Sequence, residues 1–383
     1  MTEKTPPPHN LREQSLEKTV NLSPSEALFD VTQEIPREAV EMAQRQEVLK
    51  EIDVKTHTYQ FLNYALATRT GIAKKRMMSP RKKEVNEDSG IIGDTYLAVA
   101  DGMGSKKGAK EASTYVLSLF EDAFKDRVPT GLEGSIERGQ TFVRNAQTLT
   151  AKMLEEEGFG FGSGTTFNGA VVEMLPLFRQ AALMESQAIE TTERSGDVFI
   201  TNIQVGDSHA YIQRTDGSLE LITPDEDRLS DILRRKLNTT QNNTVRTMRR
   251  KLQNELDGIP EAEHARFLSE YYSFSDEEIK EYTDWGHTIT YAIGSLVDDK
   301  PLVTFTHLLP GERLIIVSDG LDTLTKKEKE EIMRNAPDPE TASKELILRA
   351  ALKAQQNDTR EDDMTVAILQ NDFHSEKQIP ETE

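Results

Sequence analysis

The chain has 383 residues, a hydrophobic share of 36% and a formal net charge of −20. This length suits one large domain with extensions or two small domains. The acidic surplus argues against a nucleic acid or an anionic membrane as a partner. The absence of cysteine excludes disulfides, thiolate zinc sites and cysteine nucleophiles. The polar, proline-rich start is no secretory signal and no apolar run could span a bilayer, so we expect a cytoplasmic protein.

Residues 1–58 are expected to form a partly disordered N-terminal extension, which opens with three consecutive prolines. Two short helices are predicted within it, at Ser25–Thr32 and Arg37–Ile52. The second has a weak apolar face, so the extension either docks on the main body or a partner, or is a largely solvated tail. Residues 372–383 are polar and are expected to form a disordered tail.

Residues 59–371 are predicted to form the main body, a mixture of strands and paired helices. Several strands pair locally, as at the hairpin signal Asp216-Gly217, which favours antiparallel sheets covered by helices over a doubly wound parallel sheet. The predicted strands are Thr95–Ala100, Thr165–Glu173, Asp197–Val205, Ala210–Arg214, Leu219–Ile222, Arg313–Val317 and Met364–Leu369. The predicted helices are Lys107–Phe124, Arg138–Glu157, and two that begin at the capping box Thr325–Glu328 and at Asp338-Pro339.

An insert at about 225–286 stands apart, because it holds few apolar runs and many charges. A local basic cluster lies within it. This cluster either docks acidic or phosphorylated partners or is a solvated helical face. Its members are Arg234, Arg235, Lys236, Arg246, Arg249, Arg250 and Lys251.

Acidic residues at strand ends indicate a metal site. Asp101 and Asp319 each follow an apolar strand and precede a glycine, and Asp362 lies just before the last strand. A single Asp-Gly pair is more often a turn, but three such carboxylates, with Glu87-Asp88 upstream, are hard to explain as turns. They would form an oxygen-rich pocket suited to Mg²⁺ or Mn²⁺. Two such ions about 3.5–4 Å apart can share a water and clamp a phosphate.

Short motifs follow one another in a fixed order along the main body. They are Asn86-Glu87-Asp88; Asp101-Gly102-Met103-Gly104 with Gly108 and Ala112-Ser113; Gly164-Thr165-Thr166; Val205-Gly206-Asp207-Ser208; Thr290 with Ala292-Ile293-Gly294; Ser318-Asp319-Gly320-Leu321; and Asp362 with Thr365-Val366. Each motif alone is unspecific. The ordered set resembles the metal-dependent Ser/Thr phosphatases of the type 2C (PPM) family, in its bacterial form.

The resemblance implies an α+β fold, a four-layer α-β-β-α sandwich of two antiparallel sheets flanked by helix pairs. It implies a hydrolase that removes phosphate from phosphoserine and phosphothreonine on proteins, with a water bridging two Mn²⁺ or Mg²⁺ ions. Asp101 would bridge the ions and the Gly102 carbonyl would bind one. Asp319 and Asp362 would hold the other ion, and these three aspartates would be the catalytic residues.

The resemblance also implies roles for other acidic residues. Glu87 and Asp88 would act on the second ion, directly or through water. Asp207 matches a position that contributes to a third, weaker metal site in bacterial members, or it is a purely structural carboxylate.

The chain departs from the family pattern at several positions. Lys83 occupies the place of a phosphate-contacting arginine, and Arg81 lies close enough in sequence to substitute for it. Met103 replaces a histidine proposed as general acid in some eukaryotic members. His209 and Tyr291 replace two arginines, and we expect His209 to be a packed strand residue.

Two other functions stay open. The fold could serve as a catalytically weak or inactive scaffold or regulatory binding protein, although Asp101, Asp319 and Asp362 are all present. It could also act on one dedicated phosphoprotein, with residues 1–58 as a partner-binding arm. We expect a monomer.

Overall fold

The computed structural model describes residues 37–73, 81–82, 85–104, 106–126, 131–159, 162–174, 196, 198–239, 242–257, 259–285, 289–295, 301–357 and 361–373. The chain divides into two units after Ala43, within helix α1 (Arg37–Lys50). Every other described element belongs to the second unit, residues 44–383. No helix of the described residues is long and apolar enough to cross a membrane.

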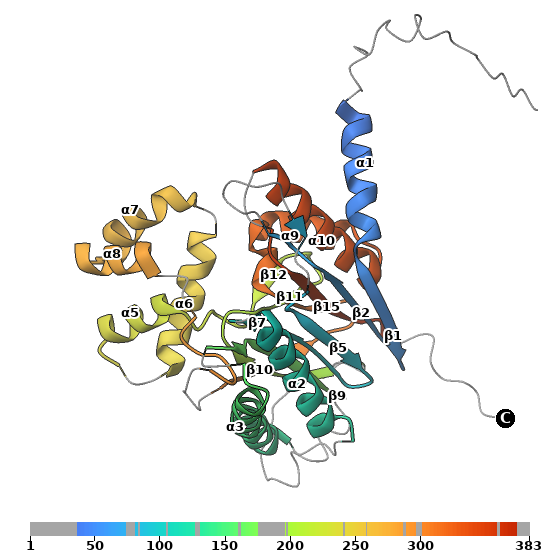
Figure 1. Ribbon diagram of the computed structural model, residues 1–383, viewed down its shortest axis with the longest axis horizontal. Helices are drawn as coiled ribbons and strands as arrows, with labels where there is room; N and C mark the ends of the chain where they lie inside the picture. The colour runs from blue at the N-terminus through green and yellow to red at the C-terminus, as the bar shows by residue number, and fades with distance from the viewer. Residues whose placement is uncertain are drawn as a thin grey trace, which may run out of the picture. The chain divides into compact units, whose positions relative to one another are not determined.

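Six strands form an antiparallel sheet in the order β1-β2-β15-β14-β11-β12 (Figure 1). The C-terminal strand β15 pairs with both β2 and β14, so the two ends of the body meet in the middle of this sheet. The strands are β1 (Asp53–Tyr59), β2 (Leu62–Arg69), β11 (His209–Gln213), β12 (Leu219–Leu221), β14 (Arg313–Val317) and β15 (Met364–Asn371).

Five strands form a second antiparallel sheet in the order β13-β10-β9-β6-β5. They are β5 (Ser89–Gly93), β6 (Tyr96–Ala100), β9 (Phe167–Met174), β10 (Val198–Val205) and β13 (Leu302–Leu308). Two short pairs complete the described strands: β3 (Ile72–Ala73) with β4 (Arg81–Lys82), and β7 (Gly102–Met103) with β8 (Gly164–Thr165).

Alternating side chains stack the two sheets and attach the helices. Along β14, Leu314 and Ile316 point into the core between the sheets, whereas Ile315 and Val317 pack against helices. These helices are α9 (Lys326–Asn335) and α10 (Pro339–Gln356), which follow the 3₁₀ turn η1 (Asp319–Thr323). Helices α2 (Lys106–Phe124) and α3 (Gly131–Glu156) cover the other sheet with a core rich in phenylalanine. The predicted four-layer α-β-β-α sandwich is confirmed (Figure 1).

Helix ends follow their sequence signals. Thr325 accepts a hydrogen bond from the Glu328 backbone, and the Glu328 side chain accepts one from the Thr325 N–H, which is the predicted capping box. Asp338 caps α10 by accepting from Thr341 N at 2.7 Å. Gly158, with φ +73°, lies just past the end of α3, where the left-handed backbone favours glycine.

The sheet begins earlier than the predicted body. β1 pairs with β2 along its whole length, so Asp53–Tyr59 belongs to the fold and not to an extension. Helix α1 agrees with the prediction at Arg37–Ile52, and its Val48 is buried in the core beneath α10. At the other end, Asp372 still donates from its backbone to Phe61 O at 2.9 Å. The predicted helix Ser25–Thr32 and the rest of the polar tail lie outside the described residues.

The insert forms four helices with their own hydrophobic core (Figure 1, yellow to orange). They are α5 (Arg228–Lys236), α6 (Asn242–Leu256), α7 (Glu261–Tyr272) and α8 (Asp276–Trp285). The core consists of apolar residues from all four helices and of Phe274, which lies between α7 and α8: Leu229, Ile232, Leu233, Val245, Leu252, Leu256, Leu268, Phe274 and Tyr282. The insert is therefore a small helical subdomain.

Most of the predicted basic cluster is neutralised within the insert. Arg249 is buried, with 3% of its surface exposed, and pairs with two aspartates. The interpretation of Arg249 as part of a docking surface or a solvated face is wrong. Four other members of the cluster form ion pairs at 2.5–3.2 Å: Arg234–Asp231, Arg235–Glu281, Lys236–Glu278 and Arg246–Glu226.

Candidate functional site

The aspartates of the predicted metal site lie at strand ends. β6 and β10 are both antiparallel to β9, so their C-terminal ends, followed by Asp101 and Asp207, share one edge of their sheet. In the other sheet the end of β14, followed by Asp319, lies beside the start of β15, preceded by Asp362. The stacked sheets bring these groups together: Asp101 interacts with Asp88, Asp207 and Asp319, and Asp319 interacts with Asp362.

Hydrogen bonds hold the acidic segment Glu87-Asp88 against the other sheet. Ser318 Oγ donates to Asp88 Oδ2 at 2.7 Å. Asp363, which is 2% exposed, accepts from Glu87 N and from Gly71 N, both at 2.7 Å. Asp363 therefore fixes two backbone segments beside the carboxylates, a role that the sequence did not indicate.

The clustered carboxyl groups have raised pKa values. Burial, followed by the charges of Asp363 and Asp319, raises the pKa of Asp88 to about 7, although the Ser318 hydrogen bond partly offsets this. Burial together with acidic neighbours raises the pKa of Asp319 to about 6 and the pKa values of Asp101 and Asp207 well above the usual value. Buried carboxylates are poorly hydrated and repel one another when they are charged. Binding of either protons or a cation at this place is therefore favourable.

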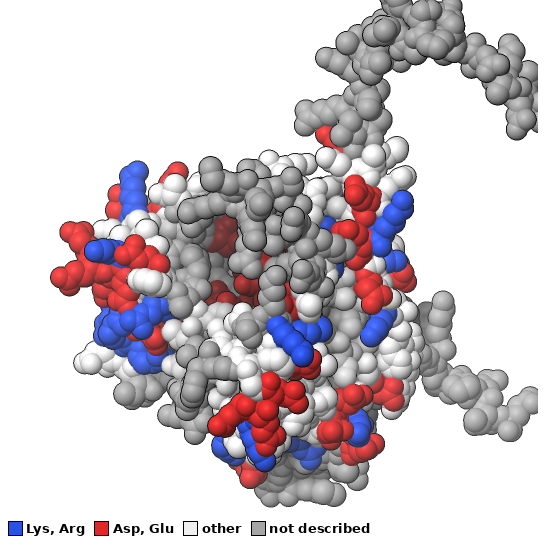
Figure 2. All heavy atoms as spheres, viewed as in Figure 1, with Lys and Arg blue, Asp and Glu red and all other residues white. Residues whose placement is uncertain are grey.

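The donor set fits a hard divalent cation. All the converging side-chain donors are carboxylate oxygens, which Mg²⁺ and Mn²⁺ prefer. Asp207 Oδ1 is buried without a hydrogen-bond partner in the described structure. Among the described residues no three His, Asp or Glu side chains are already close enough together to hold an ion. Acidic atoms are visible in a hollow near the centre of the face in Figure 2.

Gly102 lets the loop after β6 approach two other backbone segments. A Cβ at this position would lie 2.4 Å from the Ala109 carbonyl oxygen and 2.6 Å from the Glu87 carbonyl oxygen. The neighbouring Asp101 carbonyl oxygen accepts from Thr166 N at 2.9 Å. A side chain at Gly102 would push Asp101 away from the Glu87 segment.

The predicted phosphate-binding residues lie largely outside the described structure. The backbone of Arg81 pairs with Ala73 in the short ladder of β3 and β4. The side chain of Arg81 and all of Lys83 are not described.

His209 is a buried strand residue, as expected, but it also connects two aspartates that the sequence did not single out. Its Nε2 contacts Asp225 Oδ1, and its Nδ1 lies 3.3 Å from Asp322 Oδ1. Burial alone would lower the pKa of His209, but Asp225 and Asp322 together raise it well above its usual value. No local sequence signal could reveal these contacts, because the three residues belong to separate segments.

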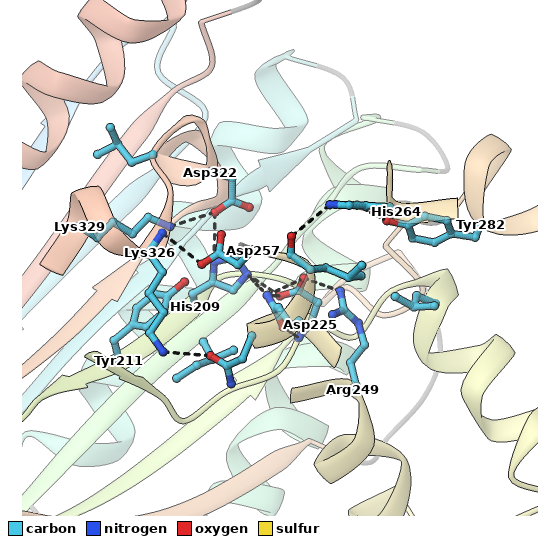
Figure 3. A pocket seen from close by; sticks show the side chains of 16 residues that line it. His209, Tyr211, Asp225, Arg249, Asp257, His264, Tyr282, Asp322, Lys326 and Lys329 are labelled. Carbon is cyan, nitrogen blue, oxygen red and sulfur yellow. Dashed lines mark hydrogen bonds and ion pairs between the residues drawn. The ribbon is translucent and has the colours of Figure 1, made fainter. Parts of the chain in front are cut away.

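A cavity of about 210 Å³ lies beside this histidine, between the insert and the body (Figure 3). Arg249 and Gln253 of α6 line it, together with Asp322 and Lys329. Ion-paired side chains line the cavity together with leucine and tyrosine side chains, and it lies where the insert meets the body.

The sequence model of the family described as Protein phosphatase 2C matches residues 81–354, well over half of the chain. None of the curated protein sequences matches the chain.

Solved structures with a similar fold are bacterial phosphatases. The Mycobacterium tuberculosis serine/threonine phosphatase PstP/Ppp has 21% identity and a TM-score of 0.52, with 82% of this chain and 99% of that chain covered. The catalytic domain of PstP in complex with two manganese ions has 21% identity and a TM-score of 0.52, covering 81% and 97%. The S. agalactiae serine/threonine phosphatase has 15% identity and a TM-score of 0.52, covering 83% and 99%. At these identities the likeness shows the fold.

Proposed function

The chain belongs to the protein phosphatase 2C family, and on this premise we propose that its strand-end carboxylates carry out metal-dependent hydrolysis of phosphoserine and phosphothreonine on proteins. The observation that supports this site most directly is the meeting of Asp88, Asp101, Asp207 and Asp319 with raised pKa values. Such a group of buried carboxylates is suited to divalent cations.

We propose that Asp101, Asp319 and Asp362 hold two Mn²⁺ or Mg²⁺ ions and are the catalytic residues. Glu87, Asp88 and the Gly102 carbonyl would complete the set, and Asp207 would serve a third, weaker site. When bound, the cations supply charge neutralisation for the phosphoryl oxygens and a more acidic water as nucleophile. The manganese ions in the PstP catalytic domain support this choice of metal.

We further propose that Lys83 or Arg81 orients the phosphate. Lys83 would act as a point charge, whereas Arg81 could bind two phosphoryl oxygens at once. Arg81→Ala and Lys83→Ala, made separately, should show which residue acts, because loss of a ground-state phosphate contact raises KM more than it lowers kcat. Unchanged kinetics in both variants would remove these residues from the site.

Phosphate release from peptides tests the function. The full-length protein should dephosphorylate phosphoserine and phosphothreonine peptides with Mn²⁺ or Mg²⁺, and activity should disappear with a chelator. A folded, metal-loaded protein that releases no phosphate from several such peptides would contradict the proposal and favour the scaffold interpretation.

A phosphorylated protein is the substrate that this reaction requires. We propose that residues 1–36 contribute a docking arm, and that a cytoplasmic monomer carries out the reaction. Deletion should stop at residue 36, because β1 and the buried Val48 belong to the described fold. A deletion variant that retains the wild-type rate on a protein substrate would show that residues 1–36 do not dock it. Sedimentation velocity would test whether the protein is a monomer, and cell fractionation would test its location.

The basic face of the insert is a second proposed docking element, now reduced to Arg250 and Lys251. Lys251 is exposed and only loosely paired with Glu255, at 3.9 Å. Arg250→Glu with Lys251→Glu should lower kcat/KM on an acidic protein substrate and leave a short peptide unaffected. A double variant whose kcat/KM on the protein substrate equals that of the wild type would rule this docking out.

A further inference from the structure

Arg249 of α6 binds the segment just before α5, at the start of the insert. Its Nη2 lies 2.8 Å from Asp225 Oδ2 and 2.7 Å from Asp227 Oδ2. Gln253, one turn further along α6, donates from Nε2 to Asp225 Oδ1 at 2.9 Å and lies 3.2 Å from His209 Nε2. Both α6 residues therefore converge on Asp225, and Figure 3 shows Arg249 beside it.

The same contacts continue from Asp225 to the candidate metal site. His209 contacts Asp225 through Nε2 and approaches Asp322 through Nδ1 at 3.3 Å (Figure 3). Asp322 belongs to the 3₁₀ turn η1, which begins with Asp319. In a 3₁₀ turn residues three apart lie on the same face, so the position of Asp322 is tied to that of Asp319.

Opposite charges hold together the residues that connect α6 with the candidate metal site. Lys329 of α9 approaches Asp322 at 3.4 Å and is itself buried. Two cationic side chains and three carboxylates meet here, and His209 lies between Asp225 and Asp322. All except Asp322, whose side chain is 49% exposed, lie largely out of water. Loss of one member leaves a partner buried and unpaired, so the remaining groups must shift. The six residues are Arg249, His209, Lys329, Asp225, Asp227 and Asp322.

We propose that Arg249 is a positioning residue for the metal site: through Asp225, His209 and Asp322 it holds the turn that carries Asp319, so the four-helix insert sets how tightly the site binds Mn²⁺. The proposal rests on the proposed function of the strand-end carboxylates. It gives the insert a role in the reaction although none of its described residues belongs to the proposed metal site.

Calorimetric titration of the metal-free, full-length protein with Mn²⁺ tests the proposal without requiring activity. Arg249→Gln should raise the Kd for Mn²⁺ by about tenfold. The direction is diagnostic, because removing a positive charge would by itself strengthen cation binding. Gln253→Ala changes no charge and perturbs the fold less, and it should also raise the Kd.

A double-mutant cycle identifies the route. Asp322→Asn should raise the Kd as well, and the double variant with Arg249→Gln should raise it by less than the product of the two separate changes. Arg214→Gln is the matched control, because Arg214 lies just past the other end of β11 and pairs with the buried Glu312 at 3.0 Å. This control should leave the Kd unchanged.

The outcomes separate the two proposals. If the wild type binds Mn²⁺ and hydrolyses phosphopeptides but Arg249→Gln and Gln253→Ala bind it equally well or more tightly, the positioning role is overturned and the proposed function stands. Independent effects of Arg249→Gln and Asp322→Asn would also overturn it. A wild type that binds no Mn²⁺ would overturn both.

Discussion

Ser318 Oγ donates a hydrogen bond to Asp88 Oδ2 at 2.7 Å and so joins the two sheets at the end where the carboxylates meet. Ser318 follows β14 in the six-stranded sheet, and Asp88 precedes β5 in the five-stranded sheet. The same hydroxyl accepts from Thr365 N at 3.0 Å. One uncharged side chain therefore fixes the distance between the two halves of the candidate site.

Ser318→Ala should destabilise the protein by about 1–3 kcal/mol, because it leaves a buried carboxylate oxygen and a buried N–H without partners. Urea denaturation would measure the change. Ser118→Ala is the matched control, since Ser118 is exposed on α2 and bonds only within its own helix. Equal stability of the Ser318→Ala and Ser118→Ala variants would show that the hydroxyl does not hold the sheets together.

The stability of the metal-free protein should fall as pH rises. The pKa values of Asp88 and Asp319 are about 7 and about 6 in the folded chain, against about 3.9 for an unfolded aspartate. Between these values the folded chain holds protons that the unfolded chain has released. As pH rises through this range, each group therefore lowers the free energy of unfolding by up to about 1.4 kcal/mol per pH unit. The stabilisation is complete below about pH 4 and is lost through about pH 6–7.

Denaturation in chelator at about pH 5 and about pH 8 measures this dependence. Asp88→Asn should reduce it, and Mn²⁺ should restore stability at the higher pH by replacing the lost protons. A chelated protein that is equally stable at both values would contradict the raised pKa values.

Gly102→Ala should disturb the site with little effect on the core. The added methyl group would meet the Ala109 and Glu87 carbonyls at 2.4 and 2.6 Å, and both are backbone atoms that cannot rotate away. We expect the Kd for Mn²⁺ to rise by at least about tenfold as Asp101 and the Glu87 segment separate. Calorimetric titration measures this, and an unchanged Kd would show that the loop accommodates the methyl group.

The insert should behave as a folded subdomain with its own core. Leu252 is fully buried in that core, and Leu252→Ala should lower the stability of the insert by about 2–5 kcal/mol. Hydrogen exchange of residues 228–285 would report the change. Leu149→Ala on α3 is the control, because Leu149 is 40% exposed. Unchanged exchange in the Leu252→Ala variant would mean that the insert core is not cooperative.

The central strands could be predicted from sequence because their side chains are buried on both faces. Arg313–Val317 and Met364–Leu369 read as apolar runs, and both are strands in the structure. β1 could not be recognised in this way, since it is an edge strand whose Asp53, Lys55 and Thr56 face water. The sequence of the insert holds few apolar runs because each of its helices contributes only a few residues to the core.

Some features of the candidate site could likewise be predicted from sequence, and others could not. The strand-end aspartates follow from local motifs, and the structure brings Asp101, Asp207 and Asp319 together. The contacts of Arg249 with Asp225 and of His209 with Asp322 join segments far apart in sequence. No local pattern encodes such contacts, so the sequence alone places Arg249 in a basic cluster and not in a buried ion pair.

The most direct test of the central claim is phosphate release from a phosphothreonine peptide by the wild type and by Asp319→Asn, each with Mn²⁺ and with a chelator. The substitution keeps the shape of the side chain and removes its charge. The account predicts metal-dependent release by the wild type and a loss of at least about a hundredfold in the folded variant. Release that survives the chelator, or that is equal in the two proteins, would contradict it.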